Sequence, residues 1–286
     1  MNSWIVALLF VAGLLLLLLG AGAYGNWSWN RSTEELLARL EASRDRESAL
    51  GVVSADELRE LPGPVRRYLE TVLPEDAPII ARARLSQEGE MELNGSWAPF
   101  TARQEVVTRR PGFVWNATMR MMKVLRARVH DAYIGGEGLL HGTLFGLVTV
   151  AEMSGTPETA EGELLRYLAE APWYPTALLP RNGLSWRAVD ESSAEVTLTD
   201  GETVVSMVYH FGEDRLVESV QAESRGRQVG GESIPTPWGG RFWNYRRIDG
   251  MLIPTEGEVA WWLPEGRAPY WRGKILDVEY ERGAVR

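Results

Sequence analysis

The sequence predicts an α+β fold, in which a large curved antiparallel sheet (an incomplete β-barrel) carries helices on its concave side and follows an N-terminal transmembrane helix. Three observations predict this fold. From Ile79 onward, most of the chain alternates apolar and polar residues with a period of two. Asn-Gly, Asp-Gly and Gly-Gly pairs divide this pattern into consecutive hairpins. The first thirty residues carry no charged side chain.

The apolar run 4–24 is 21 residues long, which matches the ~20 residues that cross a bilayer as a helix. Trp27 and Trp29 follow it and indicate an interfacial aromatic belt. We interpret the run as a retained single-pass anchor. A cleaved signal peptide is the alternative, because Ala21-Gly22-Ala23 is typical of a cleavage site.

Three regions follow from this reading: an anchor and interfacial segment (1–30), a helical linker (31–60) and a half-barrel domain (61–286). We expect the domain to be extracytoplasmic. The two arginines that follow the span, Arg31 and Arg39, favour the opposite side by the positive-inside rule.

Capping residues predict the helices. Ser32 with Glu35, and Ser54 with Glu57, fit the capping box, and Pro64 fits a helix start. We expect helices over 32–44, from 54, and over 64–73. Thr156 and Pro157 open a further helix that Pro172 ends.

The predicted strands form two series separated by the 156–172 helix. The first covers 79–93, 97–109, 113–121, 124–134 and 138–151, and the second covers 194–199, 202–211, 215–224, 241–248, 251–262 and 270–281. A seven-residue polar loop is expected within 259–274. The glycine- and proline-rich stretch 224–240 is expected to be a lid or a disordered segment.

Composition excludes several classes of function. The net charge of -9 argues against a nucleic-acid partner. The chain has no cysteine, and its three histidines do not show metal-ligand spacing. Catalytic motifs are mostly absent: there is no Gly-x-Ser-x-Gly elbow, phosphate loop, Gly-x-Gly-x-x-Gly or His-Glu-x-x-His. We therefore assign no catalytic residue, metal or cofactor, although carboxylates such as Glu163, Asp190 and Glu223 could pair in the fold.

The tryptophans are the strongest signal of a binding site. In "EVAWWL", Val259 and Trp261 share one strand face while Trp262 lies on the other. We expect a curved sheet whose concave wall includes Trp115, Trp243 and Trp262. The alternative is that Trp262 packs under a loop or near a hairpin tip.

The segment 168–180 continues past its helix into Trp173 and Tyr174 between prolines. It is too apolar for water and too short to cross a membrane, so we expect it to plug the open end of the curved sheet. Ordinary core packing is the alternative.

Basic residues concentrate between Arg103 and Arg128, with Arg126, Arg128 and His130 on one strand face. Either this is a solvated face, or it is a basic lip that meets anionic lipid headgroups.

The stretches "LPGPVRRYLETVLP", "GSWAPFTARQ", "GFVWNA", "DAYIGGEG" and "GELLRYLAEAPWYPTALLP" together resemble an uncharacterised family of bacterial membrane-anchored proteins over residues 61–281. "FWNYRRIDGMLIPTEGEVAWW" is similar to a hairpin of the half-barrel of the periplasmic lipoprotein carrier. The second resemblance implies an incomplete antiparallel barrel around helices that holds acyl chains or an apolar segment.

The first hypothesis is therefore a membrane-anchored module that binds an apolar or amphiphilic ligand, with the membrane and a lipid or acyl chain as partners. Trp115, Trp243 and Trp262 would form the wall, Trp173 and Tyr174 the plug, and Arg126 and Arg128 would hold an anionic head. The alternatives are a hydrolase with paired carboxylates and a structural envelope protein with a filled core.

Overall fold

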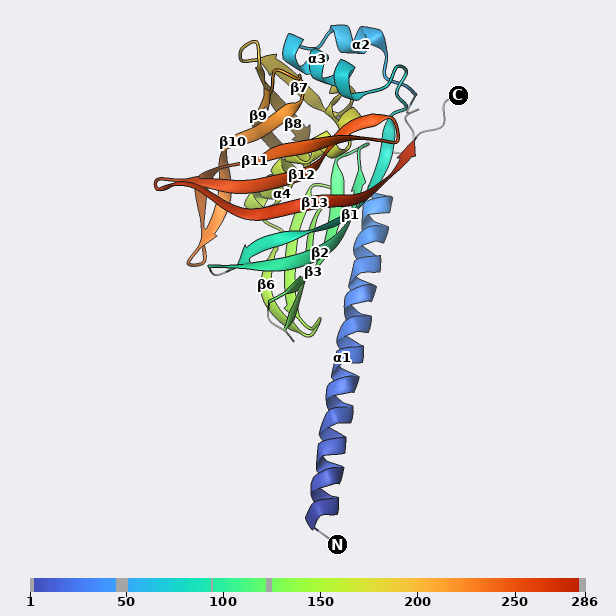
Figure 1. Ribbon diagram of the computed structural model, residues 1–286, viewed down its shortest axis with the longest axis vertical. Coiled ribbons are helices and arrows are strands. Elements are labelled where there is room, and N and C mark those ends of the chain that lie inside the picture. Colours follow the sequence, from blue (N-terminus) through green and yellow to red (C-terminus); the bar gives the residue numbers. More distant parts are fainter. Residues whose placement is uncertain (1–2, 45–50, 94, 122–124, 283–286) are drawn as a thin grey trace.

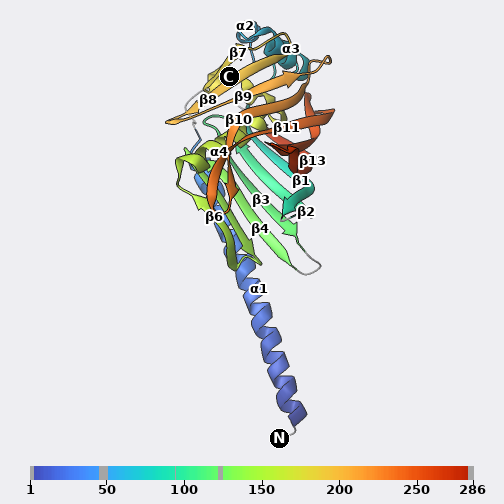
Figure 2. The same cartoon turned by 90° about the vertical axis from the view of Figure 1, so that its left-hand side faces the viewer.

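The computed structural model describes residues 3–44, 51–93, 95–121 and 125–282. Asn94 of the expected Asn94-Gly95 turn and Lys123 of the basic run lie outside the described residues. In the described part of the chain, thirteen strands form one antiparallel sheet in the order β6-β5-β4-β3-β2-β1-β13-β12-β11-β10-β9-β8-β7. The sheet curls around a central helix (Figures 1 and 2), which confirms the predicted half-barrel.

Two meanders build the sheet because hairpin turns join almost all neighbouring strands. They meet where β1 pairs with β13. The first comprises β1 (Ile80–Leu93), β2 (Ser96–Val107), β3 (Gly112–Arg120), β4 (Arg126–Ile134), β5 (Glu137–Leu144) and β6 (Val148–Ser154). The second comprises β7 (Leu184–Ala188), β8 (Ser193–Asp200), β9 (Thr203–Phe211), β10 (Val217–Val229), β11 (Glu232–Ile248), β12 (Met251–Leu263) and β13 (Gly266–Arg282).

A bridging segment connects the two edge strands, β6 and β7, and crosses the concave side of the sheet. It consists of α4 (Pro157–Ala169) and three 3₁₀ turns, η1 (Ala171–Trp173), η2 (Pro175–Leu178) and η3 (Pro180–Asn182). Thr156 caps α4 as predicted, since its Oγ1 accepts the N–H of Thr159 at 3.2 Å. α4 packs against β4, β5, β9 and β10, so it lies inside the curl.

The short helices α2 (Ala55–Arg59) and α3 (Gly63–Val72) lie at the end of the sheet opposite the N-terminus (Figure 1). Ser54 caps α2 through the N–H of Glu57 at 3.1 Å, and Pro64 lies in the first turn of α3. Both predicted starts are confirmed.

α1 (Ser3–Ala42) is one continuous helix, so the expected separate helix over 32–44 is wrong. Ser32 lies within a helical turn and does not cap one. The helix continues because Gly25, Trp29, Leu36 and Leu40 form one buried stripe that packs on the convex face of the sheet. One end of α1 thus projects away from the domain while the other is part of it (Figure 1).

Four strand predictions are also corrected. The stretch 138–151 is two strands, because a turn at Phe145-Gly146 divides it. The expected lid 224–240 is the hairpin of β10 and β11, which turns at Gly230-Gly231, where both residues have positive φ. The seven-residue loop expected within 259–274 is instead a turn of two residues between Leu263 and Gly266. β7 was not predicted.

Candidate functional site

Aromatic side chains cover the concave face. Phe100, Trp115, Trp238, Phe242 and Trp271 project inward from β2, β3, β11 and β13 and are buried or half-buried. Phe100 stacks on Trp271 with ring centroids 5.8 Å apart, and Trp173 contacts both Phe242 and Trp271. The concave side is therefore lined by rings, as the sequence predicted, but largely by different residues.

Three glycines lie side by side across this aromatic surface. The strand register aligns Gly89 of β1 with Gly273 of β13, and Gly273 with Gly257 of β12. A Cβ at position 273 would come within 2.1 Å of the Trp271 ring, and one at position 89 within 2.9 Å of Phe100. The glycine row thus provides the space in which the rings lie flat on the sheet.

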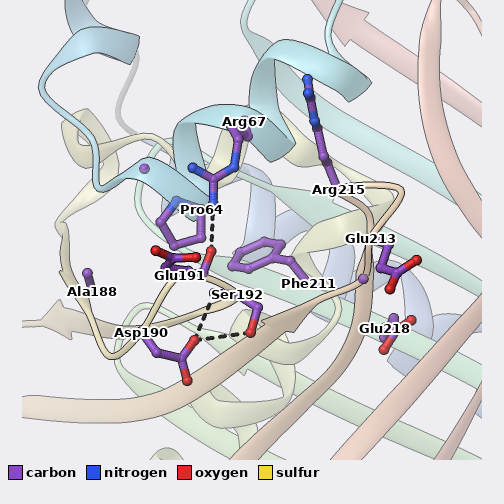
Figure 3. Close-up of a pocket in the computed structure, with 12 residues that line it drawn as sticks. Pro64, Arg67, Ala188, Asp190, Glu191, Ser192, Phe211, Glu213, Arg215 and Glu218 are labelled. Atoms are coloured by element: carbon purple, nitrogen blue, oxygen red, sulfur yellow. Dashed lines mark hydrogen bonds between the residues drawn. The ribbon is translucent and has the colours of Figure 1, made fainter.

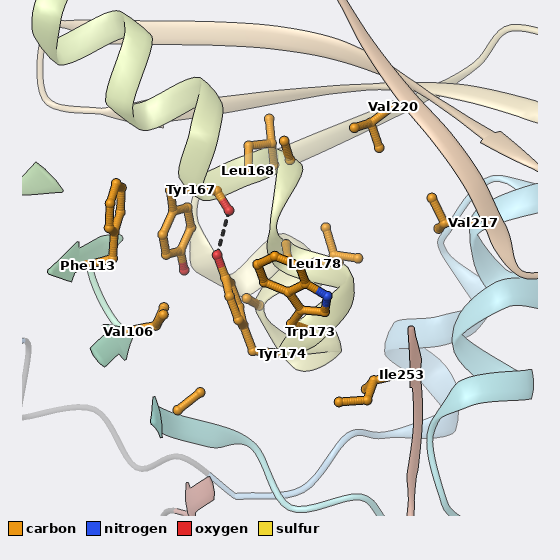
Figure 4. Close-up of a cluster of buried hydrophobic side chains, with 14 of the residues drawn as sticks. Val106, Phe113, Tyr167, Leu168, Trp173, Tyr174, Leu178, Val217, Val220 and Ile253 are labelled. Carbon is orange, nitrogen blue, oxygen red and sulfur yellow. Dashed lines mark hydrogen bonds between the residues drawn. The ribbon is translucent and has the colours of Figure 1, made fainter. Parts of the chain in front are cut away.

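The bridging segment fills one end of the concave side. Trp173 and Tyr174 are almost completely buried, and Tyr174 donates to the Tyr167 carbonyl at 2.7 Å (Figure 4). Tyr280 donates to the Trp173 carbonyl at 2.6 Å. The Trp173 indole N–H has no partner among the described residues. The segment occupies the concave side as a plug would.

The three tryptophans of the predicted wall do not lie together. Trp115 is inside, 1% exposed, and donates to Gln87 at 2.8 Å. Trp243 pairs with Glu256 and donates to it at 2.8 Å, and it is 40% exposed. Strand alternation places Trp243 and Trp262 on the convex face, opposite to Trp238 and Trp261.

Trp262 lies next to the β12–β13 turn, where the Arg267 guanidinium covers its ring at 5.8 Å from the centroid. The alternative reading, in which Trp262 lies near a hairpin tip, describes this position. The predicted wall is therefore not assembled on one face.

Arg126, Arg128 and His130 share one face of β4, as the alternation predicted, and it is the convex face that α1 packs on. Arg128 donates to Asn26 of α1 at 2.7 Å, whereas Arg126 is exposed at the β3–β4 turn. His130 is fully buried and stacks on Trp29, with ring centroids 3.8 Å apart.

A cluster of five charged residues lies buried between α4 and the concave face. Arg166 of α4 pairs with Asp131 of β4 and with Glu170, the latter at 2.9 Å. Glu163 of α4 pairs with Arg225 of β10 at 3.1 Å. The side chains of these residues are at most 13% exposed.

Aromatic rings and amides surround this cluster. The Arg166 guanidinium lies 4.9 Å from the centroid of Trp115, and that of Arg225 lies 4.5 Å from the centroid of Trp238. Gln104 donates to Glu170 at 2.6 Å. Such contacts compensate in part for the loss of hydration around the two arginines.

Burial, and secondarily the negative charge of Asp131, raises the pKa of Glu163 well above its usual value. Arg166 and Arg225 balance the charges of Asp131 and Glu170, so Glu163 is the carboxylate left over. Oε2 of Glu163 and Oδ1 of Asp131 are the two carboxylate oxygens of this pair that lack a donor. A proton on Glu163, donated to Asp131, satisfies both oxygens and leaves the cluster neutral.

Apolar side chains near the turn ends of the concave face are only partly buried. Met91 and Leu93 of β1, Val129 of β4, Leu144 of β5 and Trp261 of β12 pack on the main core but keep exposed surface. We call these five residues the open-end strip. Leu93, Leu144 and Trp261 lie at or near the β1–β2, β5–β6 and β12–β13 turns.

A separate cleft of about 1030 Å³ lies beside α3 at the opposite end of the molecule (Figure 3). Its lining includes charged side chains, among them Arg67, Asp190, Arg215 and Glu218. Hydrogen bonds from Ser192 and Ser193 lower the pKa of Asp190. Pro64, Ala188 and Phe211 add apolar surface to the same lining.

The carboxylates considered for catalysis do not meet. Glu163 lies in the buried cluster, Asp190 lines the cleft and Glu223 is exposed. The carboxylate that interacts with Glu163 is Asp131, and no sequence pattern marked this residue. Among the described residues, no group of three or more histidine, aspartate or glutamate side chains could hold a metal ion.

Comparison with known proteins identifies the family. A model described as a family of unknown function (DUF6920) matches residues 59–280. The chain belongs to this family. Membership of an uncharacterised family, expected from the sequence motifs, is confirmed. A search of curated proteins gives no match.

Three solved structures align with most of this chain at low sequence identity. A putative outer membrane lipoprotein-sorting protein domain from Vibrio parahaemolyticus is 10% identical, with a TM-score of 0.42 over 79% of this chain and 94% of that chain. A DUF1329 family protein from Desulfovibrio piger is 12% identical, with a TM-score of 0.40 over 77% and 93%. A LolA superfamily protein from Nitrosomonas europaea is 10% identical, with a TM-score of 0.34 over 81% and 96%.

Proposed function

We propose that this DUF6920 protein is a membrane-anchored module that binds one apolar or amphiphilic ligand, a lipid or a lipoprotein acyl chain, at the open end of its concave face. The observation that carries the proposal is the open-end strip, because five apolar side chains there are partly exposed although they continue the core. An acyl chain laid on this strip would complete the core and leave water.

The ligand would use the concave rings and the rim in different ways. Trp115, Trp173 and Tyr174 are buried and would form the floor behind the strip. Arg126 lies on the convex face, but it is exposed at the β3–β4 turn, where its long side chain would reach around the strand end to an anionic head. Arg128 would not bind the head itself, because its guanidinium donates a hydrogen bond to Asn26 of α1. Trp243 and Trp262 lie on the other face and take no part.

The anchor is the outer half of α1. This half is long and apolar enough to cross a membrane, and its most apolar stretch is not buried against the domain. A bilayer would cover this surface. The proposal places the domain on the extracytoplasmic side. The chain lacks cysteine, so labelling of Val204→Cys in intact cells with an impermeant maleimide tests that placement.

Burial of an acyl chain provides enough free energy for tight binding, so the proposed function requires no catalytic residue. Each buried CH₂ contributes about 0.8 kcal/mol. Several methylenes against Met91, Leu144 and Trp261 would therefore hold a chain that also keeps contact with the membrane.

Native mass spectrometry of the full chain released from detergent micelles tests the proposal. We expect one bound lipid on the wild-type protein and at least about a tenfold loss of that adduct in Leu144→Glu, because a charge in the strip opposes acyl burial. Val204→Glu is the control, since Val204 is exposed on β9. Equal adducts in both variants, or none in the wild type, would refute the proposal.

A hydrolase remains the second candidate because Asp131 and Glu163 form a close carboxyl pair with a raised pKa at Glu163. Both side chains are buried and each has an arginine partner. The one cleft described above does not reach them. These observations favour an internal ion cluster over a catalytic pair.

A further inference from the structure

The turn between β5 and β6 packs directly against α1. A Cβ at Gly25 would come within 2.4 Å of the Phe145 carbonyl and 2.8 Å of Leu147 Cγ, and one at Gly146 within 2.4 Å of the Gly25 carbonyl. Two glycines therefore allow a backbone contact between the helix and the hairpin tip. The contact fixes the height of the tip along α1.

That height coincides with the expected edge of the bilayer. Residues 4–24 rise about 31 Å as a helix, which equals the ~30 Å of the hydrocarbon core. Gly25 is the next residue, and the exposed Tyr24 and Trp27 lie beside it. Figure 1 shows the lower ends of the first-meander strands beside the middle of α1.

The side chains of this tip are apolar and face outward. Phe145 is 45% exposed, Leu147 43%, Val148 59% and Val150 55%. Four large apolar side chains gathered at one turn are unusual for a surface in water, and they indicate a partner.

The backbone at Phe145 supports the same conclusion. Its φ is +56°, in the left-handed region, and Gly146 follows with +72°. A turn of this kind ordinarily carries Asn-Gly or Asp-Gly, because a bulky residue is strained there. A phenylalanine that is both strained and exposed points to a selected role outside the fold.

We propose that the β5–β6 tip, residues 145–150, is a second membrane contact that inserts into the headgroup and acyl boundary of the leaflet where α1 emerges. The inference rests on the proposed anchoring by α1. The occupant is the phospholipid surface, since the tip is continuous with the anchor. Arg120 and Arg126, exposed at the two ends of the adjacent β3–β4 turn, would face the headgroups. The contact would hold the open-end strip close to the bilayer.

Site-directed labelling tests this contact in the full chain, which has no cysteine to remove. Single variants Leu14→Cys, Val148→Cys and Val204→Cys carry an environment-sensitive fluorophore in nanodiscs of phosphatidylcholine and phosphatidylglycerol. Lipids with a nitroxide near the headgroup then quench labels at the interface. We expect quenching at Val148 at least about threefold stronger than at Val204.

The three positions separate the two proposals. Quenching at Leu14 by deep nitroxides without quenching at Val148 would overturn the hairpin contact and leave the anchor intact. Absence of quenching at both would overturn the anchor and the contact together. Nanodiscs of phosphatidylcholine alone show whether anionic headgroups are needed: unchanged quenching supports apolar insertion, and complete loss overturns it in favour of electrostatic adsorption.

Two substitutions in α1 test how the tip is positioned without changing any residue of the tip. Gly25→Leu forces the hairpin away from α1, whereas Gly22→Leu is the matched control because a Cβ at that position meets no atom within 4 Å. We expect the quenching at Val148 to fall about threefold in Gly25→Leu and to stay unchanged in Gly22→Leu. Equal quenching in both would show that the contact with α1 does not position the tip.

Discussion

Protonation of Glu163 makes the buried cluster of charged residues electrically neutral. The two arginines near it are balanced by Asp131 and Glu170, so an ionised Glu163 would be an uncompensated charge in the core. A protonated Glu163 accepts from Arg225 through Oε1 and donates to Asp131 through Oε2. The cluster then fixes α4 to β4 and β10.

Glu163→Gln tests this proton. The pKa of Glu163 is raised in the folded protein, so its contribution to the free energy of unfolding is complete below its ordinary value of 4.5 and declines as pH rises through the folded value. The glutamine carries a permanent N–H donor instead. We expect its Tm to match that of the wild type near pH 5 and to exceed it increasingly at higher pH.

Thermal unfolding in a mild detergent between pH 5 and 9 measures the difference. Glu223→Gln, at an exposed position on β10, is the control and should follow the wild type throughout. A Tm of Glu163→Gln that stays below the wild type over the whole range would show that Glu163 acts as a carboxylate.

Phe145→Asn separates stability from membrane contact at one residue. Asparagine adopts positive φ more readily than phenylalanine, so we expect the free energy of unfolding to rise by about 1 kcal/mol. The lipid quenching of a label at Val148 should fall in the same variant. If stability decreases in detergent solution, the phenylalanine is a packing residue and the strain argument fails.

The docking of α1 on β4 depends on a neutral histidine. Thr33 Oγ1 donates to the Trp29 carbonyl at 3.0 Å, so its 2.8 Å contact with His130 indicates that Nε2 carries the proton of the ring. His130 Nδ1 has no partner within the described residues. Burial, His141 and Arg128 lower the pKa of His130 to about 4.

Acidification should therefore loosen this element. A folded-state pKa below the ordinary 6.5 means that the stabilising contribution is present above pH 6.5 and is lost as pH falls towards 4. The loss amounts to roughly 3 kcal/mol at most. The protection factors of residues 25–42 against hydrogen exchange should fall between pH 6.5 and 4.5 in the wild type and in His210→Gln, and far less in His130→Phe. An unchanged pH response in His130→Phe would assign the effect to another group.

Sequence patterns predicted the elements better than their contacts. Alternation and turn pairs located most strands, and capping residues located α2, α3 and α4, because these are local preferences. The same alternation separated Trp261 from Trp262. It could not tell which of them faces inward, since that depends on the pairing of β12 with β11.

The parts of the site that escaped prediction are those assembled from distant segments. Gly89, Gly257 and Gly273 form a row only in the register of three strands. Asp131, Glu163 and Arg225 meet because the bridging segment must cross the concave side to join β6 to β7. Nothing near each residue in the chain marks it as part of a cluster.

The whole molecule is a half-barrel whose two edges are joined by its own plug. Trp173 and Tyr174 of the bridging segment are buried in the core, and the proposed ligand site is the partly buried open-end strip. α1 packs on the convex face and points its apolar half away from the domain (Figure 2). Binding of a lipid acyl chain at the strip would therefore take place next to the bilayer that supplies the lipid.

Photocrosslinking tests this central claim most directly. The full chain in nanodiscs is irradiated with a phospholipid that carries a diazirine in its acyl chain, and the adducts are mapped by peptide mass spectrometry. The account predicts adducts on Met91, Leu93, Val129, Leu144 or Trp261 in addition to those on α1. Adducts confined to α1 and the β5–β6 tip would contradict it and would leave an anchored scaffold with a filled core.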